Sequence, residues 1–178
     1  MTVWVALLRA VNVSGVNRLP MEEFRALLGG LGLEGARTYI QSGNAVFRSN
    51  LSGPVLSDRI ADAILTRFRF RPPVLMLTAD DLVAALAGCP FATEEGTKVH
   101  VFFAGRDLPR ATGDFLKSLA APGEAWGWRG RVLWLHLPDG LARSKLARRV
   151  MDLPVDMTAR NLNTVRALEG LTAKVGQA

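Results

Sequence analysis

The chain has 178 residues, of which 49% are hydrophobic and 21% are charged, a composition that excludes a disordered protein. Its net charge of +6 comes almost entirely from arginines spread along the chain, so the charge alone does not identify nucleic acid as a partner. The longest apolar stretch, VWVALL, is too short to cross a membrane, and the N-terminus lacks the pattern of a signal peptide. We therefore expect a cytoplasmic protein without membrane contact.

Cysteine usage excludes two further classes. Cys89 is the only cysteine, so there is no disulfide framework and no cysteine-based zinc or iron–sulfur centre. Its apolar neighbours predict a buried, inert thiol. We predict no metal and no cofactor.

The first half of the chain predicts the order βαββαβ. The run VWVALLR, residues 3–9, is typical of a buried strand, and Pro20 then marks the first turn of a helix. ARTYIQ and AVFR follow as strands joined by Ser42-Gly43-Asn44. Pro54 introduces a second helix, and PPVLML closes the half as a strand. Thr78 and Asp81 then frame a short helix with capping-box spacing.

The second half repeats this order. KVHVFFA is a strand, a helix follows around residues 115–119, and GEAWGW and RVLWLHL form a hairpin. A helix from about Ser144 to Met151, a strand PVDMT and a terminal helix from about Asn163 to Lys174 complete the chain. We predict an α+β fold of two duplicated ferredoxin-like (βαββαβ) units with antiparallel sheets and an extra C-terminal helix. Residues 1–78 form the first unit, 79–97 the connection and 98–178 the second unit.

This topology predicts one polar site in the first half. Strands 1 and 3 are central neighbours in such a sheet, so the loop that leaves the former lies beside the start of the latter. The residues expected to cluster there are Arg9, Asn12, Asn17, Ser42 and Asn44. Their loops could offer backbone N–H groups to an anion, but Asn and Gly also simply permit tight turns. For Ser42-Gly43-Asn44 a hairpin turn is the default interpretation.

A second predicted site contains both histidines of the protein. Antiparallel pairing brings His100 and His136 to one edge of the second sheet. The polar residues expected around them are Arg143, Ser144, Lys145, Thr158, Arg160, Asn161 and Asn163. Imidazoles beside cationic groups could bind phosphate or act as acid or base, although histidines within apolar strands are also common as structural groups. Ser144 alternatively serves only to cap its helix. A third metal ligand is not evident.

Four ordered motifs resemble those of one family. VALLRAVNVSGVNRLPMEEFRALL, RTYIQSGNAVF, LARSKL and TARNLNTV are similar to a family of uncharacterised bacterial proteins, the domain of unknown function number sixteen ninety-seven. The resemblance extends from residue 3 to about residue 170. It implies a two-part α+β fold of duplicated βαββαβ type and no particular activity. The family usually has Asn-Val-Gly-Gly where this chain has Asn12-Val13-Ser14-Gly15. If the first glycine of that pair serves to adopt a positive φ, we do not expect Ser14 to take over this role.

Three classes of function follow from these features. The preferred hypothesis is a binding module for an anionic small molecule or nucleotide, which uses one or both polar edges. The alternative is a phosphoester-acting enzyme with His100 or His136 as acid or base. The third is an RNA-binding protein. An RNA-recognition sheet needs an open face with stacking aromatics, whereas the strands VWVALL and RVLWLHL are apolar on both faces.

Overall fold

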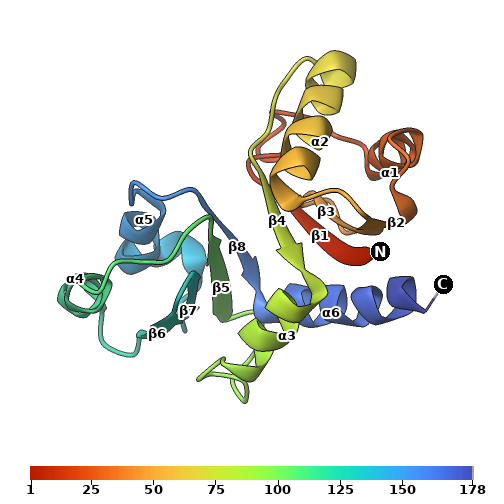
Figure 1. Ribbon diagram of the computed structural model, residues 1–178. Helices are drawn as coiled ribbons and strands as arrows, with labels where there is room; N and C mark the ends of the chain where they lie inside the picture. Colours follow the sequence, from red (N-terminus) through yellow and green to blue (C-terminus); the bar gives the residue numbers. More distant parts are fainter. Residues whose placement is uncertain (178) are drawn as a thin grey trace. The chain divides into compact units, whose positions relative to one another are not determined.

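The computed structural model describes residues 1–177 (Figure 1). In it the chain folds into two compact units. The first unit contains residues 1–83 together with the chain from Ala167 on, and the second contains residues 84–166. The C-terminal helix, which the sequence assigned to the second half, therefore contributes to both units. Within the described residues there are two four-stranded antiparallel sheets and six α-helices.

The first sheet has the strand order β2-β3-β1-β4, with all neighbours antiparallel. Its central pair is β1 and β3, as predicted. The elements of this part of the chain are β1 (Thr2–Leu8), α1 (Met21–Gly30), β2 (Glu34–Tyr39), β3 (Asn44–Ser49), α2 (Gly53–Phe68), β4 (Val74–Thr78) and α3 (Ala79–Ala87).

The second sheet has the strand order β6-β7-β5-β8, again fully antiparallel. Its elements are β5 (Val99–Ala104), α4 (Thr112–Leu119), β6 (Ala125–Arg129), β7 (Val132–His136), the 3-10 turn η1 (Leu141–Arg143), α5 (Lys145–Met151), β8 (Met157–Asn161) and α6 (Leu162–Gly176). The mixed α/β class and the antiparallel sheets are confirmed.

Each sheet buries one face against a pair of helices. The helices are amphipathic, and burial of each large apolar side chain contributes about 1.5–3 kcal/mol. In the first unit the buried face joins Ala6, Leu8 and Phe47 to Phe24 and Leu28 of α1 and to Leu56, Ile60 and Ile64 of α2. In the second unit it joins Phe102, Leu133 and Leu135 to Leu116 of α4 and to Leu146 and Val150 of α5.

Local signals placed most element boundaries well. Thr78 and Asp81 form the predicted capping box: the Asp81 N–H donates to Thr78 Oγ1 at 3.2 Å, and the Thr78 N–H donates to Asp81 Oδ2 at 2.7 Å. The predicted strand PVDMT is wrong by three residues, because β8 begins only at Met157. Pro154 is the central residue of a turn in which the Val155 N–H donates to Leu153 O at 2.7 Å, so pairing with β5 starts later.

Candidate functional site

The loop that follows β1 is a small hairpin. The Asn12 N–H donates to Asn17 O at 3.1 Å, and the Val16 N–H donates to Val13 O at 2.9 Å. Between the two valines, Ser14 has φ 50° and Gly15 has φ 77°, the signs of a type I′ turn. Ser14 therefore does adopt a positive φ, and the expectation that serine would depart from this conformation was wrong.

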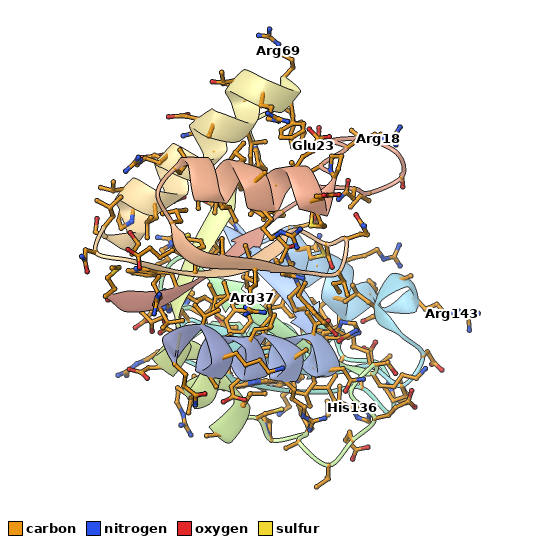
Figure 2. The ribbon with its side chains drawn as sticks, turned by 90° about the vertical axis from the view of Figure 1, so that its right-hand side faces the viewer. Arg18, Glu23, Arg37, Arg69, His136 and Arg143 are labelled. Atoms are coloured by element: carbon orange, nitrogen blue, oxygen red, sulfur yellow. The ribbon has the colours of Figure 1, made fainter. Side chains whose placement is uncertain are left out.

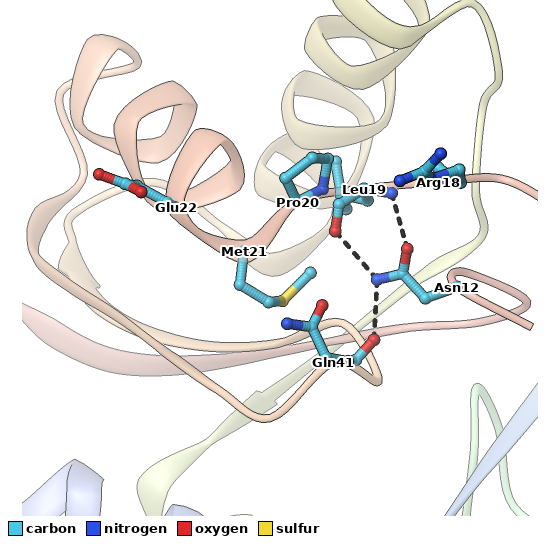
Figure 3. A pocket seen from close by; sticks show the side chains of 7 residues that line it. All are labelled: Asn12, Arg18, Leu19, Pro20, Met21, Glu22 and Gln41. Atoms are coloured by element: carbon cyan, nitrogen blue, oxygen red, sulfur yellow. Dashed lines mark hydrogen bonds between the residues drawn. The ribbon is translucent and has the colours of Figure 1, made fainter.

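Asn12 holds this hairpin against two other segments (Figure 3). Its Nδ2 donates to Leu19 O at 2.9 Å and to Gln41 O at 2.8 Å, and its Oδ1 accepts from the Leu19 N–H at 2.8 Å. Asn17 acts in a similar way, because its Nδ2 donates to Ala10 O at 2.9 Å. The two amide groups thus organise the loops, and both Nδ2 protons of Asn12 are already used.

The tripeptide Ser42-Gly43-Asn44 is the turn between β2 and β3. Gly43 has φ 73°, and a Cβ at this position would lie 2.5 Å from Val11 Cγ2, so only glycine fits. Asn44 is fully buried, and its Nδ2 donates to Tyr39 O at 3.2 Å. The tripeptide therefore has a structural role: Gly43 permits close packing against Val11, and Asn44 makes a buried hydrogen bond.

The five predicted residues of this half lie in one connected loop region, with one at its margin. Asn12 contacts Gln41, which directly precedes Ser42, and Asn44 Nδ2 lies 3.5 Å from Ser42 Oγ. Arg9 is exposed, and its backbone N–H donates to Pro73 O at 3.0 Å, beside the start of β4.

A pocket of about 350 Å³ opens at the edge of this region (Figure 3). It lies where the loop after β1 enters α1, and Leu19, Pro20 and Met21 supply its apolar wall. Its lining residues are Asn12, Arg18, Leu19, Pro20, Met21, Glu22 and Gln41. The site prediction included only Asn12 of these. Arg18 and Gln41 stand in the motifs that were singled out, but nothing in their spacing marks them as pocket residues.

Both charged side chains of the pocket lack a protein partner. Arg18 and Glu22 are exposed, and neither has a side-chain hydrogen bond or ion pair within residues 1–177. Glu23, the next residue of α1, differs, because its Oε2 accepts from Arg67 Nη2 at 2.9 Å. Gln41 also keeps its side-chain amide unpaired in the described chain, since only its backbone carbonyl meets Asn12.

In the second unit the two histidines share an edge of the sheet but point to opposite faces. Val99 pairs with His136, and His100 pairs with Leu135, so the histidines are offset by one residue. Because side chains alternate along a strand, this offset places the imidazoles on opposite faces. The backbone positions are adjacent as predicted, but a joint constellation of both rings does not form.

His100 faces the apolar core below α4 and α5. It shares its face with Leu135 and with Asn161, its partner on β8. Its Nε2 is buried and has no hydrogen-bond partner among residues 1–177. Burial lowers the pKa of His100 below its ordinary value of 6.5, which favours the neutral imidazole.

His136 lies on the other face, beside the segment between α3 and β5. Its Nε2 is 3.7 Å from Glu94 Oε2, and its ring centroid is 5.8 Å from that of Phe91. Its side chain is 19% exposed. Figure 2 shows Arg143 directed outward and well away from His136.

The remaining predicted residues of this half each support local structure or lie in solvent. Ser144 caps α5, since its Oγ accepts from the Ala147 N–H at 3.0 Å. Arg160 Nη1 donates to Thr158 Oγ1 at 2.9 Å, and burial lowers the pKa of Arg160 to about 10. Asn161 Oδ1 accepts from the Thr164 N–H at 2.9 Å.

The other three residues of this prediction, Arg143, Lys145 and Asn163, are exposed. Asn163 Oδ1 lies close to Gly96, where a Cβ would clash with it. Neither Arg143 nor Lys145 has a side-chain hydrogen bond or ion pair in the part of the chain that the structure describes.

The region that the structure describes offers no group of three or more His, Cys, Asp or Glu residues able to hold a metal ion. Among residues 1–177, none of the helices has the length and apolar character needed to cross a membrane. Cys89 is buried as predicted, and burial raises the pKa of its thiol.

Two antiparallel sheets, each covered by a helix pair, and a loop-built pocket define an α+β protein whose fold alone names no chemistry. The profile of the family described as "Protein of unknown function (DUF1697)" matches residues 1–134, and the chain belongs to this family. The predicted family is thereby confirmed over residues 1–134, which contain the first two motifs, whereas LARSKL and TARNLNTV lie beyond the matched residues.

A conserved bacterial protein from Streptococcus pneumoniae has a similar structure. The TM-score is 0.76 at 24% sequence identity, over 96% of this chain and 98% of that one. This likeness concerns the fold alone. A comparison with the curated proteins finds no match. Neither the description of the family nor that of the Streptococcus pneumoniae protein states an activity.

Proposed function

We propose that the protein is a binding module for an anionic small molecule, such as a phosphate ester, a nucleotide or a carboxylate, and that the pocket beside α1 is its binding site. The observation that carries the proposal is Arg18, a pocket-lining guanidinium without a hydrogen bond or ion pair within residues 1–177. Guanidinium groups bind phosphate and carboxylate through paired N–H donors. Two oxygens of a carboxylate or phosphate group at Arg18 would therefore each receive one hydrogen bond.

The loops around the pocket are held in an unfavourable backbone conformation. Five residues without the freedom of glycine have positive φ: Ala10 at 57°, Asn12 at 54°, Ser14 at 50°, Asn17 at 52° and Ile40 at 46°. This conformation costs on the order of 1–2 kcal/mol at each of Ala10, Ser14 and Ile40, whereas asparagine tolerates it better. Strain of this kind gathers at ligand-binding sites, where the surrounding structure maintains it. Its position beside the pocket supports a binding role for these loops.

A thermal-shift assay with inorganic phosphate, acetate and nucleotides tests this proposal. A ligand at 100 times its dissociation constant stabilises the folded protein by about 2.7 kcal/mol. For a protein of this size, such a gain raises the melting temperature by roughly 5–10 °C. Arg18→Gln should abolish the shift. Arg25→Gln is the matched control, because Arg25 is also an exposed arginine near this end of α1 but does not line the pocket.

An equal shift in Arg18→Gln and in the wild-type protein would show that the anion binds at another site. If no anion raises the melting temperature of the wild-type protein, the proposed anion-binding function is refuted.

One observation favours an enzymatic alternative, in which His136 acts as acid or base on a phosphoester. Glu94, at 3.7 Å, could orient the His136 imidazole. His100 does not join this chemistry, because it faces the opposite side of the sheet. Hydrolysis of p-nitrophenyl phosphate esters that His136→Gln removes and His100→Gln retains would support the alternative.

RNA binding gains less support. Residues on both faces of the central strands β5 and β7 are buried, among them Val101, Phe102, Leu133 and Trp134. An RNA-recognition sheet presents an open face on which bases stack.

The proposal extends to the architecture. Both halves have the order βαββαβ, and their strand orders β2-β3-β1-β4 and β6-β7-β5-β8 correspond. This correspondence supports two duplicated ferredoxin-like (βαββαβ) repeats. The repeat boundaries 1–78, 79–97 and 98–178 and a cytoplasmic location are proposed from the sequence alone. Superposition of the two halves over all eight strands and their paired helices tests the duplication.

A further inference from the structure

The pocket beside α1 carries two opposite charges that are kept apart. Figure 3 shows Arg18 and Glu22 at opposite ends of the pocket, with the Met21 side chain between them. They do not form an ion pair with each other. A single anion fits only one end, because at the other end it would meet the carboxylate of Glu22.

Glu22 differs from several acidic residues of the same unit, which form ion pairs with arginine. Glu23 pairs with Arg67 at 2.9 Å, Glu34 with Arg48 at 3.5 Å, and Asp58 and Asp62 both with Arg71 at 2.9 and 2.8 Å. Glu22, which lines the pocket, has no such partner within residues 1–177.

The wall between the two charges is apolar. Leu19 is fully buried, and Pro20 and Met21 present a ring and a thioether to the pocket. Gln41, on the side facing Met21, adds a neutral amide that can donate and accept hydrogen bonds. Asn12 fixes both walls through its bonds to Leu19 and Gln41, so the arrangement exists before any ligand arrives.

We infer that the pocket takes a zwitterion, an organic molecule with a carboxylate or phosphate held by Arg18, a protonated amine held by Glu22 and an apolar segment along Met21. This inference rests on the proposed function, since it uses the same anion site at Arg18. It adds that the ligand must also carry a cationic group.

A structural role could also account for Glu22. Acidic residues in the first turn of a helix interact favourably with the helix dipole, with or without a ligand. Asp80 provides a matched control, because it lies in the first turn of α3, is exposed and does not line the pocket. A dipole effect alone would change stability in both variants and ligand affinity in neither.

Isothermal titration calorimetry with simple probes tests the inference. The zwitterions are ω-amino carboxylates of increasing length, including γ-aminobutyrate and ε-aminocaproate, each compared with the carboxylate and the amine of the same length. We expect one zwitterion to bind the wild-type protein about fivefold more tightly than its matching carboxylate, the gain of one partly exposed ion pair. Glu22→Gln should remove this gain and leave carboxylate affinity unchanged. Asp80→Asn should retain the full gain.

The outcomes separate the inference from the proposed function. Carboxylates that bind as tightly as the zwitterions, with affinity lost in Arg18→Gln, would overturn the inference and leave the anion site in place. Probe binding that Arg18→Gln does not weaken would overturn both. If none of these probes binds, the zwitterion is rejected, and the phosphate and nucleotide arms of the thermal-shift assay decide the anion site independently. Cooperative thermal unfolding of Glu22→Gln and Asp80→Asn, with at most the small loss of melting temperature expected from the helix dipole, would verify that both variants remain folded.

Discussion

Replacement of Asn12 by alanine should be one of the most destabilising changes at a partly exposed position of this protein. The Asn12 side chain makes three hydrogen bonds to the backbone, two with Leu19 and one with Gln41. Leu19 is fully buried, so its N–H and C=O have no ready replacement from solvent once the amide is lost. The loop after β1 and the turn between β2 and β3 would then lose the hydrogen bonds through which Asn12 joins them.

The size of the effect follows from these contacts. Each lost hydrogen bond costs about 1 kcal/mol, and alanine at φ 54° adds on the order of 1 kcal/mol, because asparagine tolerates the left-handed conformation better. The expected loss is therefore about 4 kcal/mol. Asn17→Ala removes one hydrogen bond at a similar φ of 52° and should cost about half as much.

Urea unfolding and amide hydrogen exchange together measure this loss. We expect a lower urea midpoint for Asn12→Ala and faster exchange of the Leu19 N–H, which donates to Asn12 Oδ1 in the native protein. Asn12→Gly separates the two causes, since glycine tolerates the positive φ but lacks the amide. A loss below about 1 kcal/mol together with unchanged Leu19 exchange would refute the assigned role of the amide.

Three further changes have defined outcomes. Gly43→Ala should destabilise by more than about 2 kcal/mol in urea unfolding, because the new methyl group would lie 2.5 Å from Val11 Cγ2 in a backbone with φ 73°. Ile40→Asn should stabilise by about 1 kcal/mol in the same assay, since Ile40 is 49% exposed and has φ 46°; an unchanged or lower midpoint would contradict the strain argument. His100→Gln should flatten the pH dependence of stability below about pH 6.5 in urea unfolding. Burial lowers the folded-state pKa of His100, so its contribution is complete above 6.5 and is lost as the pH falls through the folded value.

Several features of the fold were readable from local patterns. Apolar runs, prolines at helix starts and glycines after helices indicated the order of elements, because these signals depend on neighbours only a few residues away. The Thr78–Asp81 capping box and the Ser144 cap formed as predicted. β8 was misplaced, since a short strand with polar residues owes its position to backbone pairing with β5 more than to its own side chains.

The candidate sites depended on information that the sequence does not carry locally. A one-residue offset in the pairing of β5 with β7 sends His100 and His136 to opposite faces, and no apolar pattern reveals that offset. The sequence by itself determined the family, the antiparallel α+β architecture and the position of the polar loops, because propensity and periodicity act over short distances. Only the tertiary structure decided that the asparagine amides point into the loops and that Arg18 and Glu22 remain unpaired beside α1. Hydrogen-bond partners are chosen by proximity in space, and that proximity arises only after the sheet and helices have packed.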